Sequence, residues 1–192
     1  MRFRVVVYAV VVGLGIITLF WRPIRAQAPA AAGTQTRAPK STTSPAAQAE
    51  GNLAQVMRGI LFPNSNVVFF AQGKNPADVP AAADPSSSTD PLSDTYGGWT
   101  AVENSAVALS EAANLLTIPG RLCSNGRPVP VRNPDWLKFV QNLRAAGKIA
   151  YMDAQSKNQD KMLDASDAVS LACENCHARY RDKPGGVAAR CM

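Results

Sequence analysis

The feature that most constrains this chain is a short motif near its C-terminus, Cys173-Glu174-Asn175-Cys176-His177. On a helix, positions i, i+3 and i+4 share one face, so Cys173, Cys176 and His177 can all meet one flat ring. C-x-x-C-H is the attachment motif of a c-type haem, in which two thiols form thioethers with the porphyrin and the histidine ligates iron. The motif therefore predicts one covalently attached haem c.

Other uses of a C-x-x-C pair have to be weighed against haem attachment. A structural zinc site needs four ligands, and His177 is the only histidine among the 192 residues. A thioredoxin-like redox pair belongs near a βαβ pattern, and no alternating strand pattern stands out in this sequence. If the motif arose by chance, the chain would be an exported helical protein without a cofactor.

Residues 1–28 have the pattern of a secretory signal peptide. A basic start, Met1-Arg2-Phe3-Arg4, precedes an apolar run from Val5 to Trp21, and Ala26-Gln27-Ala28 resembles a cleavage site. The apolar run is also near the lower limit for a membrane span, so an uncleaved N-terminal anchor is the alternative. Both interpretations predict an exported, periplasmic body, and c-type haem is attached outside the cytoplasm.

The net charge of +6 does not indicate a nucleic-acid partner. Arg2, Arg4, Arg22 and Arg25 lie in the signal segment, and the remainder has 16 basic and 14 acidic residues, a net charge of +2. Two haem propionates would bring that balance close to neutrality. The charge is typical of an ordinary solvated surface.

Cys123 and Cys191 are the cysteines outside the motif. In an oxidising compartment, an even number of remaining cysteines favours a disulfide. Here the disulfide would close a long loop and hold the predicted haem helix. Two free thiols are the alternative, which is uncommon in such compartments.

The organisation of the chain follows from its composition and periodicity. Residues 29–50 are rich in Ala, Pro, Thr, Ser and Gln, which predicts a flexible tether, and residues 51–192 make up the folded body. Amphipathic helical periodicity marks four segments of that body: 52–72, 99–117, 134–155 and 159–181. We therefore predict an all-α fold, an antiparallel four-helix bundle with the haem on the C-terminal helix.

Three details of this bundle are predicted from local sequence. Pro63 should kink or restart the first helix, with Asn64 or Ser65 as the new cap. A long loop, 73–98, with repeated prolines joins helices 1 and 2. Small residues on the later part of the third helix permit close approach of either another helix or a haem: Ala146, Gly147, Ala150 and Ala154.

The motif and the residues after it, Cys173-Glu-Asn-Cys176-His177-Ala-Arg-Tyr180-Arg181, resemble the haem site of the cytochrome c′ and cytochrome c-556 family. That family attaches haem near the C-terminus through C-x-x-C-H-x-x-(Y/F)-R, on the last helix of a four-helix bundle. The resemblance covers roughly residues 52–183; it is specific at the haem helix and architectural elsewhere. The chain departs from the family in its proline-rich loop, in Pro63 and in the additional Cys123 and Cys191.

The resemblance implies roles for residues on both sides of the haem. In the family the first helix covers the open face, with Met over iron in the c-556 type and often an apolar residue in the c′ type. By position this residue is Met57, and Arg58 resembles a basic residue near a propionate, at an unusual offset from the methionine. Tyr180 and Arg181 either contact the haem and a propionate or form a solvated last turn.

Ligand chemistry leads independently to a methionine. With no second histidine in the chain, a strong sixth ligand would be a thioether. Met162 shares the predicted helix of His177, Met152 lies off the main stripe of its helix, and Met192 is terminal. Met57 is therefore the predicted second axial ligand, and plain core packing is its alternative.

Two functions remain open on the sequence alone. One is an electron carrier, with iron ligated by His177 and Met57, that meets redox partner proteins through a small, weak interface. The other is a five-coordinate, cytochrome c′-like binder of NO or CO, in which Met57 only packs over iron. An enzyme such as a peroxidase is not expected, because it needs a distal general base. The family resemblance suggests a homodimer.

Overall fold

The computed structural model describes residues 47–84 and 96–191, which belong to one compact unit, Ser44–Met192. The described residues form helices and no β-strand, with one isolated bridge between Leu122 and Pro128. The predicted all-α class is therefore confirmed. The predicted signal segment, residues 1–28, and most of the tether lie outside the described residues. Within the described part, no helix has the length and apolar character needed to cross a bilayer.

The first helical segment is continuous from Leu53 to Gly73 and contains one widened turn. It comprises α1 (Leu53–Val56), the π-helical turn η1 (Met57–Leu61) and α2 (Phe62–Gly73). A capping box begins it, because Asn52 and Gln55 each accept a hydrogen bond from the other's backbone N–H at 2.9 Å. This reciprocal bonding satisfies two of the backbone donors that a helix start leaves free.

Pro63 does not restart the helix, so of the two predicted effects, a kink or a restart, the restart was wrong. The turn before it is π-helical, and Phe62 N–H donates to the carbonyl of Met57, five residues back. Pro63 therefore lies in the first turn of α2, where its missing N–H and fixed φ are tolerated. Asn64 and Ser65 do not cap a new helix; their side chains donate to the carbonyls of Ile60 (2.7 Å) and Phe62 (3.0 Å).

The later helices follow the predicted segments closely. They are α3 (Gly98–Ala112), which continues as the 3-10 turn η4 (Ala113–Thr117), α4 (Pro134–Gln155) and α5 (Gln159–Tyr180). Asn158 caps α5, its side chain accepting from Lys161 N at 3.2 Å. Pro134 occupies the first turn of α4, and the side chain of Asn133, the residue before it, makes no capping bond.

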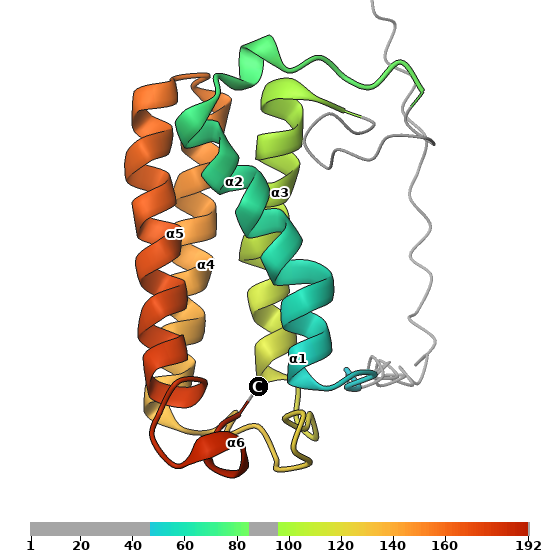
Figure 1. Cartoon of the computed structure of the whole chain (residues 1–192), viewed down its shortest axis with the longest axis vertical. Helices are drawn as coiled ribbons and strands as arrows, with labels where there is room; N and C mark the ends of the chain where they lie inside the picture. Colours follow the sequence, from blue (N-terminus) through green and yellow to red (C-terminus); the bar gives the residue numbers. More distant parts are fainter. Residues whose placement is uncertain (1–46, 85–95, 192) are drawn as a thin grey trace, which may run out of the picture. The chain divides into compact units, whose positions relative to one another are not determined.

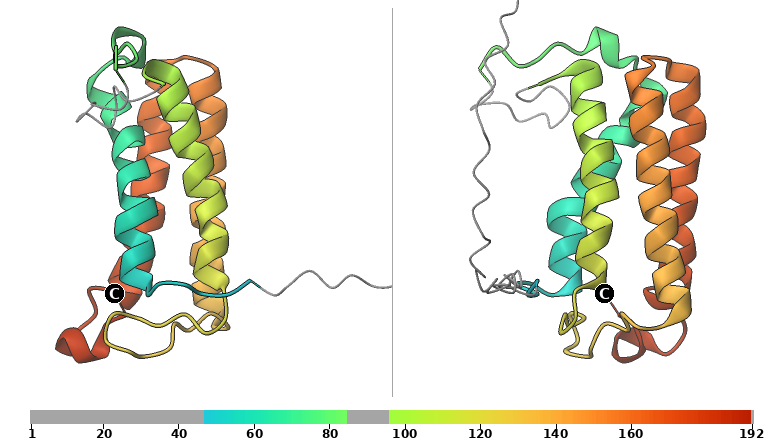
Figure 2. Two further views of the ribbon diagram at one scale, coloured as in Figure 1. Left: turned by 90° about the vertical axis from the view of Figure 1, so that its right-hand side faces the viewer. Right: turned by 180° about the vertical axis from the view of Figure 1, so that it is seen from behind.

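The long helices pack side by side around a shared apolar core. α2 packs against α3 and α5, and α4 packs against the same two helices (Figures 1 and 2). One polar side chain, Ser166, is fully buried in this core, and its hydroxyl donates a hydrogen bond to the carbonyl of Val68 at 3.2 Å. The deepest apolar side chains come from all of these helices: Val68, Ala106, Leu109, Trp136, Ala150, Met162 and Val169.

The described start of the long loop packs onto the helices. The short 3-10 helix η2 (Pro76–Asp78) and Val79, which is 6% exposed, lie against α3 near Ala101 and Val102. Residues 85–95 of this loop lie outside the described residues. The loop is therefore anchored to the end of the core from which α3 begins.

The C-terminal segment folds back onto the end of α5. Cys123 and Cys191 form a disulfide with their Cα atoms 4.9 Å apart, across 68 residues of sequence. Asn125 Nδ2 donates to the carbonyls of Val187 (3.0 Å) and Arg190 (2.6 Å), next to the short helix α6 (Gly186–Ala189). Cys191 N donates to the Tyr180 carbonyl at 2.9 Å. The segment is thus fixed to the loop before α4 and to the last residue of α5.

Small residues on α4 allow it to approach α3 closely. A Cβ on Gly147 would lie 2.7 Å from Ser110 N and 3.2 Å from the Ala106 carbonyl oxygen. The buried Ala146, Ala150 and Ala154 continue this face. Of the two interpretations of these small residues, the structure therefore supports helix packing.

We expect Gly147→Ala to destabilise the protein by about 1–3 kcal/mol, because the added methyl group meets backbone atoms of α3 that cannot easily move. Urea unfolding of the purified protein measures the change. Gly59→Ala is the matched control, since a Cβ there meets no heavy atom within 4 Å. The control should be neutral or slightly stabilising, and equal losses in both variants would contradict this account of the α3–α4 contact.

Candidate functional site

The described part of the chain contains a largely apolar cavity of about 430 Å³, lined from the first helical segment, α3, η4, α4 and α5. This volume lies within the usual range for cofactor and ligand pockets, roughly 300–1,000 Å³. Its apolar walls come from residues far apart in sequence: Ala54, Leu61, Phe62, Phe69, Leu109, Leu116, Phe139, Val140, Leu143 and Ala172. The cavity can therefore receive a bulky apolar group with a few polar anchors.

The C-x-x-C-H motif lines this cavity from α5. Cys173, Cys176 and His177 are all partly buried and all border the same space, whereas Glu174 and Asn175 are exposed. This is the arrangement that the i, i+3, i+4 spacing predicts. Both thiols are free. One helix face thus presents two thiols and an imidazole to a single apolar space.

Met57 and Arg58 line the cavity from η1. Met57 is partly buried, and it also shares a smaller cavity of about 30 Å³ with His177. Met152 is half exposed on α4 and Met162 is buried in the core, and neither lines these cavities, while Met192 lies outside the described residues. Of the described methionines, Met57 is the one that borders the same space as His177.

The three motif side chains that line the cavity, Cys173, Cys176 and His177, are in surroundings that favour their neutral forms. Burial raises the pKa of Cys173, and burial together with the neighbouring Cys173 raises the pKa of Cys176 to about 12. Redox-active C-x-x-C pairs depend on a lowered thiol pKa, because the thiolate is the nucleophile. Burial and the nearby Arg181 lower the pKa of His177, which leaves the imidazole in the neutral form that can ligate a metal.

Tyr180 and Arg181 are placed differently from each other. The Tyr180 hydroxyl donates to Asp135 Oδ1 at 2.7 Å, and its ring meets Trp136 edge-on with centroids 4.9 Å apart. Tyr180 therefore lies outside the large cavity, although it borders the smaller one. Arg181 lines the large cavity, but its Nε and Nη2 both donate to the Asp182 carboxylate at 2.8 Å.

Asp135 is a residue of this region that sequence reasoning missed. Its carboxylate accepts bonds from Tyr180, from Arg179 Nε at 3.1 Å and from Trp136 N at 2.9 Å. The bonds from Tyr180 and Arg179 hold the pKa of Asp135 below its usual value. The sequence indicated Asp135 only as an acid in the first turn of a helix, and nothing in it signalled partners more than 40 residues away.

Two further observations complete the description of the site. Within residues 47–84 and 96–191, no group of three or more His, Cys, Asp or Glu side chains is gathered so as to hold a bare metal ion. In comparisons with known proteins, no family model, no curated protein and no solved structure matches the chain. The resemblance to the cytochrome c′ and c-556 family therefore stays a prediction from the sequence.

Because of the Asp135–Tyr180 hydrogen bond, the free energy of unfolding should fall as the pH is lowered into the acid range. A carboxyl group with a lowered folded-state pKa stabilises the protein above its unfolded-state pKa, near 3.9, and that stability is lost as pH falls through the folded value. We expect Tyr180→Phe to lower the urea midpoint near neutral pH, with the difference from the unmodified protein shrinking below about pH 4.

Tyr151→Phe provides the matched control, because the Tyr151 hydroxyl accepts a hydrogen bond from Gln155 and bonds to no carboxylate among the described residues. Its effect on the urea midpoint should be the same at neutral and at acid pH. A Tyr180→Phe deficit that stays constant as the pH is lowered would show that the Asp135 contact does not supply the pH dependence.

Proposed function

We propose that this protein is an exported monohaem c-type cytochrome, an antiparallel four-helix bundle that carries electrons in the periplasm. One observation carries the proposal: Cys173, Cys176 and His177 line, from one face of α5, an apolar cavity that Met57 lines from a different element. A covalent haem needs two thiols and an imidazole on the same side of a ring, and a six-coordinate haem needs a second ligand from elsewhere in the chain.

The residues around the cavity fit a haem by their chemistry. Cys173 and Cys176 would hold the porphyrin through thioethers, and His177 and Met57 would ligate the iron. Arg58 and Arg181 line the same cavity and would pair with the two propionates. Among the described residues Arg58 makes no ion pair, so its guanidinium is available for this role. The haem supplies one-electron redox chemistry when it is bound.

The residues around the cavity would set the reduction potential of the haem and its accessibility to partner proteins. Apolar walls from several helices exclude water, and a thioether ligand raises the reduction potential. Phe62 lines the cavity yet is 63% exposed, and Arg58 is exposed beside it, so the cavity opens to the surface there. We infer that redox partner proteins meet the protein at this opening, through a small interface suited to rapid turnover.

A second candidate function is a five-coordinate binder of NO or CO. The observation that favours it is the apolar surrounding of Met57, since Ala54, Leu61 and Phe69 line the cavity from the same helical segment. An apolar distal space admits diatomic gases without a hydrogen-bonding partner. Peroxidase activity is not expected, because the described lining residues include no histidine or carboxylate besides His177 to act as a general base.

Covalent haem attachment is tested by replacing both motif cysteines. In protein exported by a host that matures c-type cytochromes, we expect the unmodified chain to retain haem on a denaturing gel. Cys173→Ala with Cys176→Ala should remove the haem stain and the corresponding mass. The matched control, Cys123→Ser with Cys191→Ser, removes as many cysteines outside the cavity and should keep the haem. Unmodified protein with the mass of the bare polypeptide would refute the proposal.

The role of Met57 is tested by absorption spectra of the ferric and ferrous protein. We expect a low-spin spectrum for the unmodified protein and a high-spin spectrum for Met57→Ala, because the variant loses the sixth ligand. Met152→Ala, on α4 and away from the cavity, should leave the spectrum unchanged. A high-spin spectrum of the unmodified protein would instead support the gas-binding function.

A further inference from the structure

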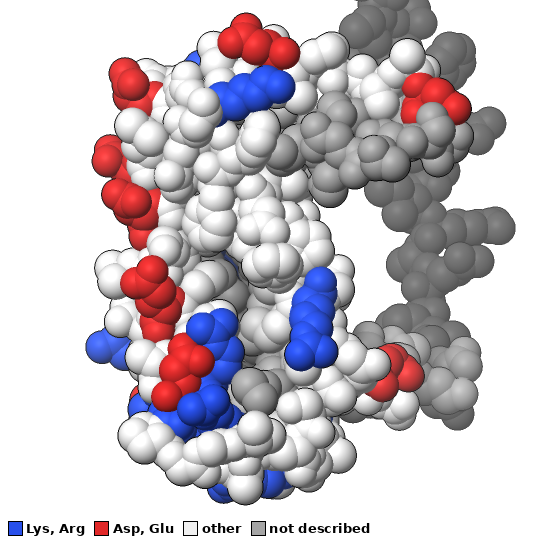
Figure 3. Space-filling view, in the orientation of Figure 1, with Lys and Arg blue, Asp and Glu red and all other residues white. Residues whose placement is uncertain are grey.

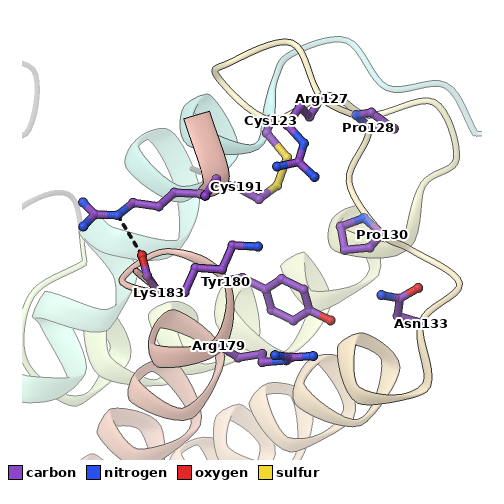
Figure 4. Close-up of a pocket in the computed structure, with 11 residues that line it drawn as sticks. Cys123, Arg127, Pro128, Pro130, Asn133, Arg179, Tyr180, Lys183 and Cys191 are labelled. Atoms are coloured by element: carbon purple, nitrogen blue, oxygen red, sulfur yellow. Dashed lines mark hydrogen bonds between the residues drawn. A yellow bond between two sulfur atoms is a disulfide. The ribbon is translucent and has the colours of Figure 1, made fainter. Parts of the chain in front are cut away.

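A second cavity, of about 210 Å³, lies at the end of α5 and shares no residue with the large apolar one. We call it the cationic pocket, because Arg127, Arg179 and Lys183 line it (Figure 4). Arg190 lines it as well, and its Nε donates to the Lys183 carbonyl at 3.2 Å. Figure 3 shows the wider pattern, with Lys and Arg gathered near the end of α5, where acidic side chains also lie among them, and Asp and Glu following its earlier part. The pocket therefore lies at the end of α5 where Lys and Arg gather.

The cations of the pocket differ in whether a described carboxylate pairs with them. Arg179 pairs with Asp135, whereas Arg127, Lys183 and Arg190 form no ion pair with a described carboxylate. Arg127 Nη1 donates to the Ala188 carbonyl at 3.1 Å, which leaves its other nitrogens free to donate. In Figure 4 the Arg127 and Lys183 side chains point toward the same space, with Tyr180 and Asn133 on its opposite side.

The pocket is held in shape by bonds between distant segments. The Cys123–Cys191 disulfide forms part of its wall and joins the loop that carries Arg127 to the segment that follows Lys183. Asn125 clamps the same segment by donating to the carbonyls of Val187 and Arg190. Cations that are fixed around a cavity before a ligand arrives lose little conformational entropy when it binds.

We propose that the cationic pocket binds a phosphate group, either as the free ion or on a small organic molecule. A phosphate group carries about −1.5 to −2 charges near neutral pH and offers several acceptor oxygens, which suits several unpaired cations. Guanidinium groups bind phosphate through paired N–H donors, and the lysine adds a mobile point charge. Pro128, Pro130 and the Tyr180 ring give the pocket apolar surface for the body of a phosphate ester.

The proposal is tested by calorimetric titration of the purified protein at constant ionic strength with inorganic phosphate and with phenyl phosphate. We expect saturable binding at one site. Lys183→Gln and Arg127→Gln should each weaken it about tenfold or more, as expected when a charged hydrogen bond is lost. Tighter binding of phenyl phosphate would identify an ester as the natural form, and equal or weaker binding would identify the free ion.

Matched controls distinguish a specific phosphate site from the general attraction of phosphate to a basic surface. Lys138→Gln and Arg132→Gln remove exposed cations outside the pocket and should change the affinity less than about twofold. Lys183 donates no side-chain hydrogen bond to a described residue, so its replacement should leave the fold intact. Absence of saturable binding, or equal losses in pocket and control variants, would overturn the proposal.

Discussion

The large cavity depends on how α4 packs against its neighbours along its length. In its second half, Gly147 lets α4 approach α3 so closely that even a methyl group there would meet backbone atoms of α3. The small, buried Ala150 and Ala154 follow on α4. In its first half, Phe139, Val140 and Leu143 line an open space instead. Because a packed core tolerates few voids, the close contact at one end fixes the helices while the other end keeps room for a large group.

The widened turn η1 lies just before Pro63 and forms part of the wall of that cavity. A regular helix would place the proline ring against the carbonyl four residues earlier, and the π-helical turn relieves this clash. The same turn begins at Met57, which lines the cavity. Such turns within helices are frequent at functional sites, because they shift side chains relative to a regular helix.

The end of α5 is fixed by a second set of interactions just after His177. Tyr180 joins α5 to Asp135 at the start of α4, and its carbonyl accepts a bond from Cys191. The disulfide then joins that segment to the loop before α4. The motif therefore lies between the packed core of the helices and this set of bonds at the end of α5. The disulfide and Tyr180 also line the cationic pocket. A cofactor site needs such rigid support, because ligands must keep their positions.

The sequence by itself determined the all-α class, the approximate helix boundaries, and the placement of Cys173, Cys176 and His177 on one helix face. These features depend on spacing along the chain, on capping residues and on turn-forming residues, all of which are local. Tertiary structure decided the rest. It placed Met57 with His177, turned Tyr180 toward Asp135 and gathered cations from two loops, because contacts between distant segments depend on packing that no single segment encodes. The helix restart expected at Pro63 was mispredicted because the clash of the proline ring is relieved by a change in the preceding turn.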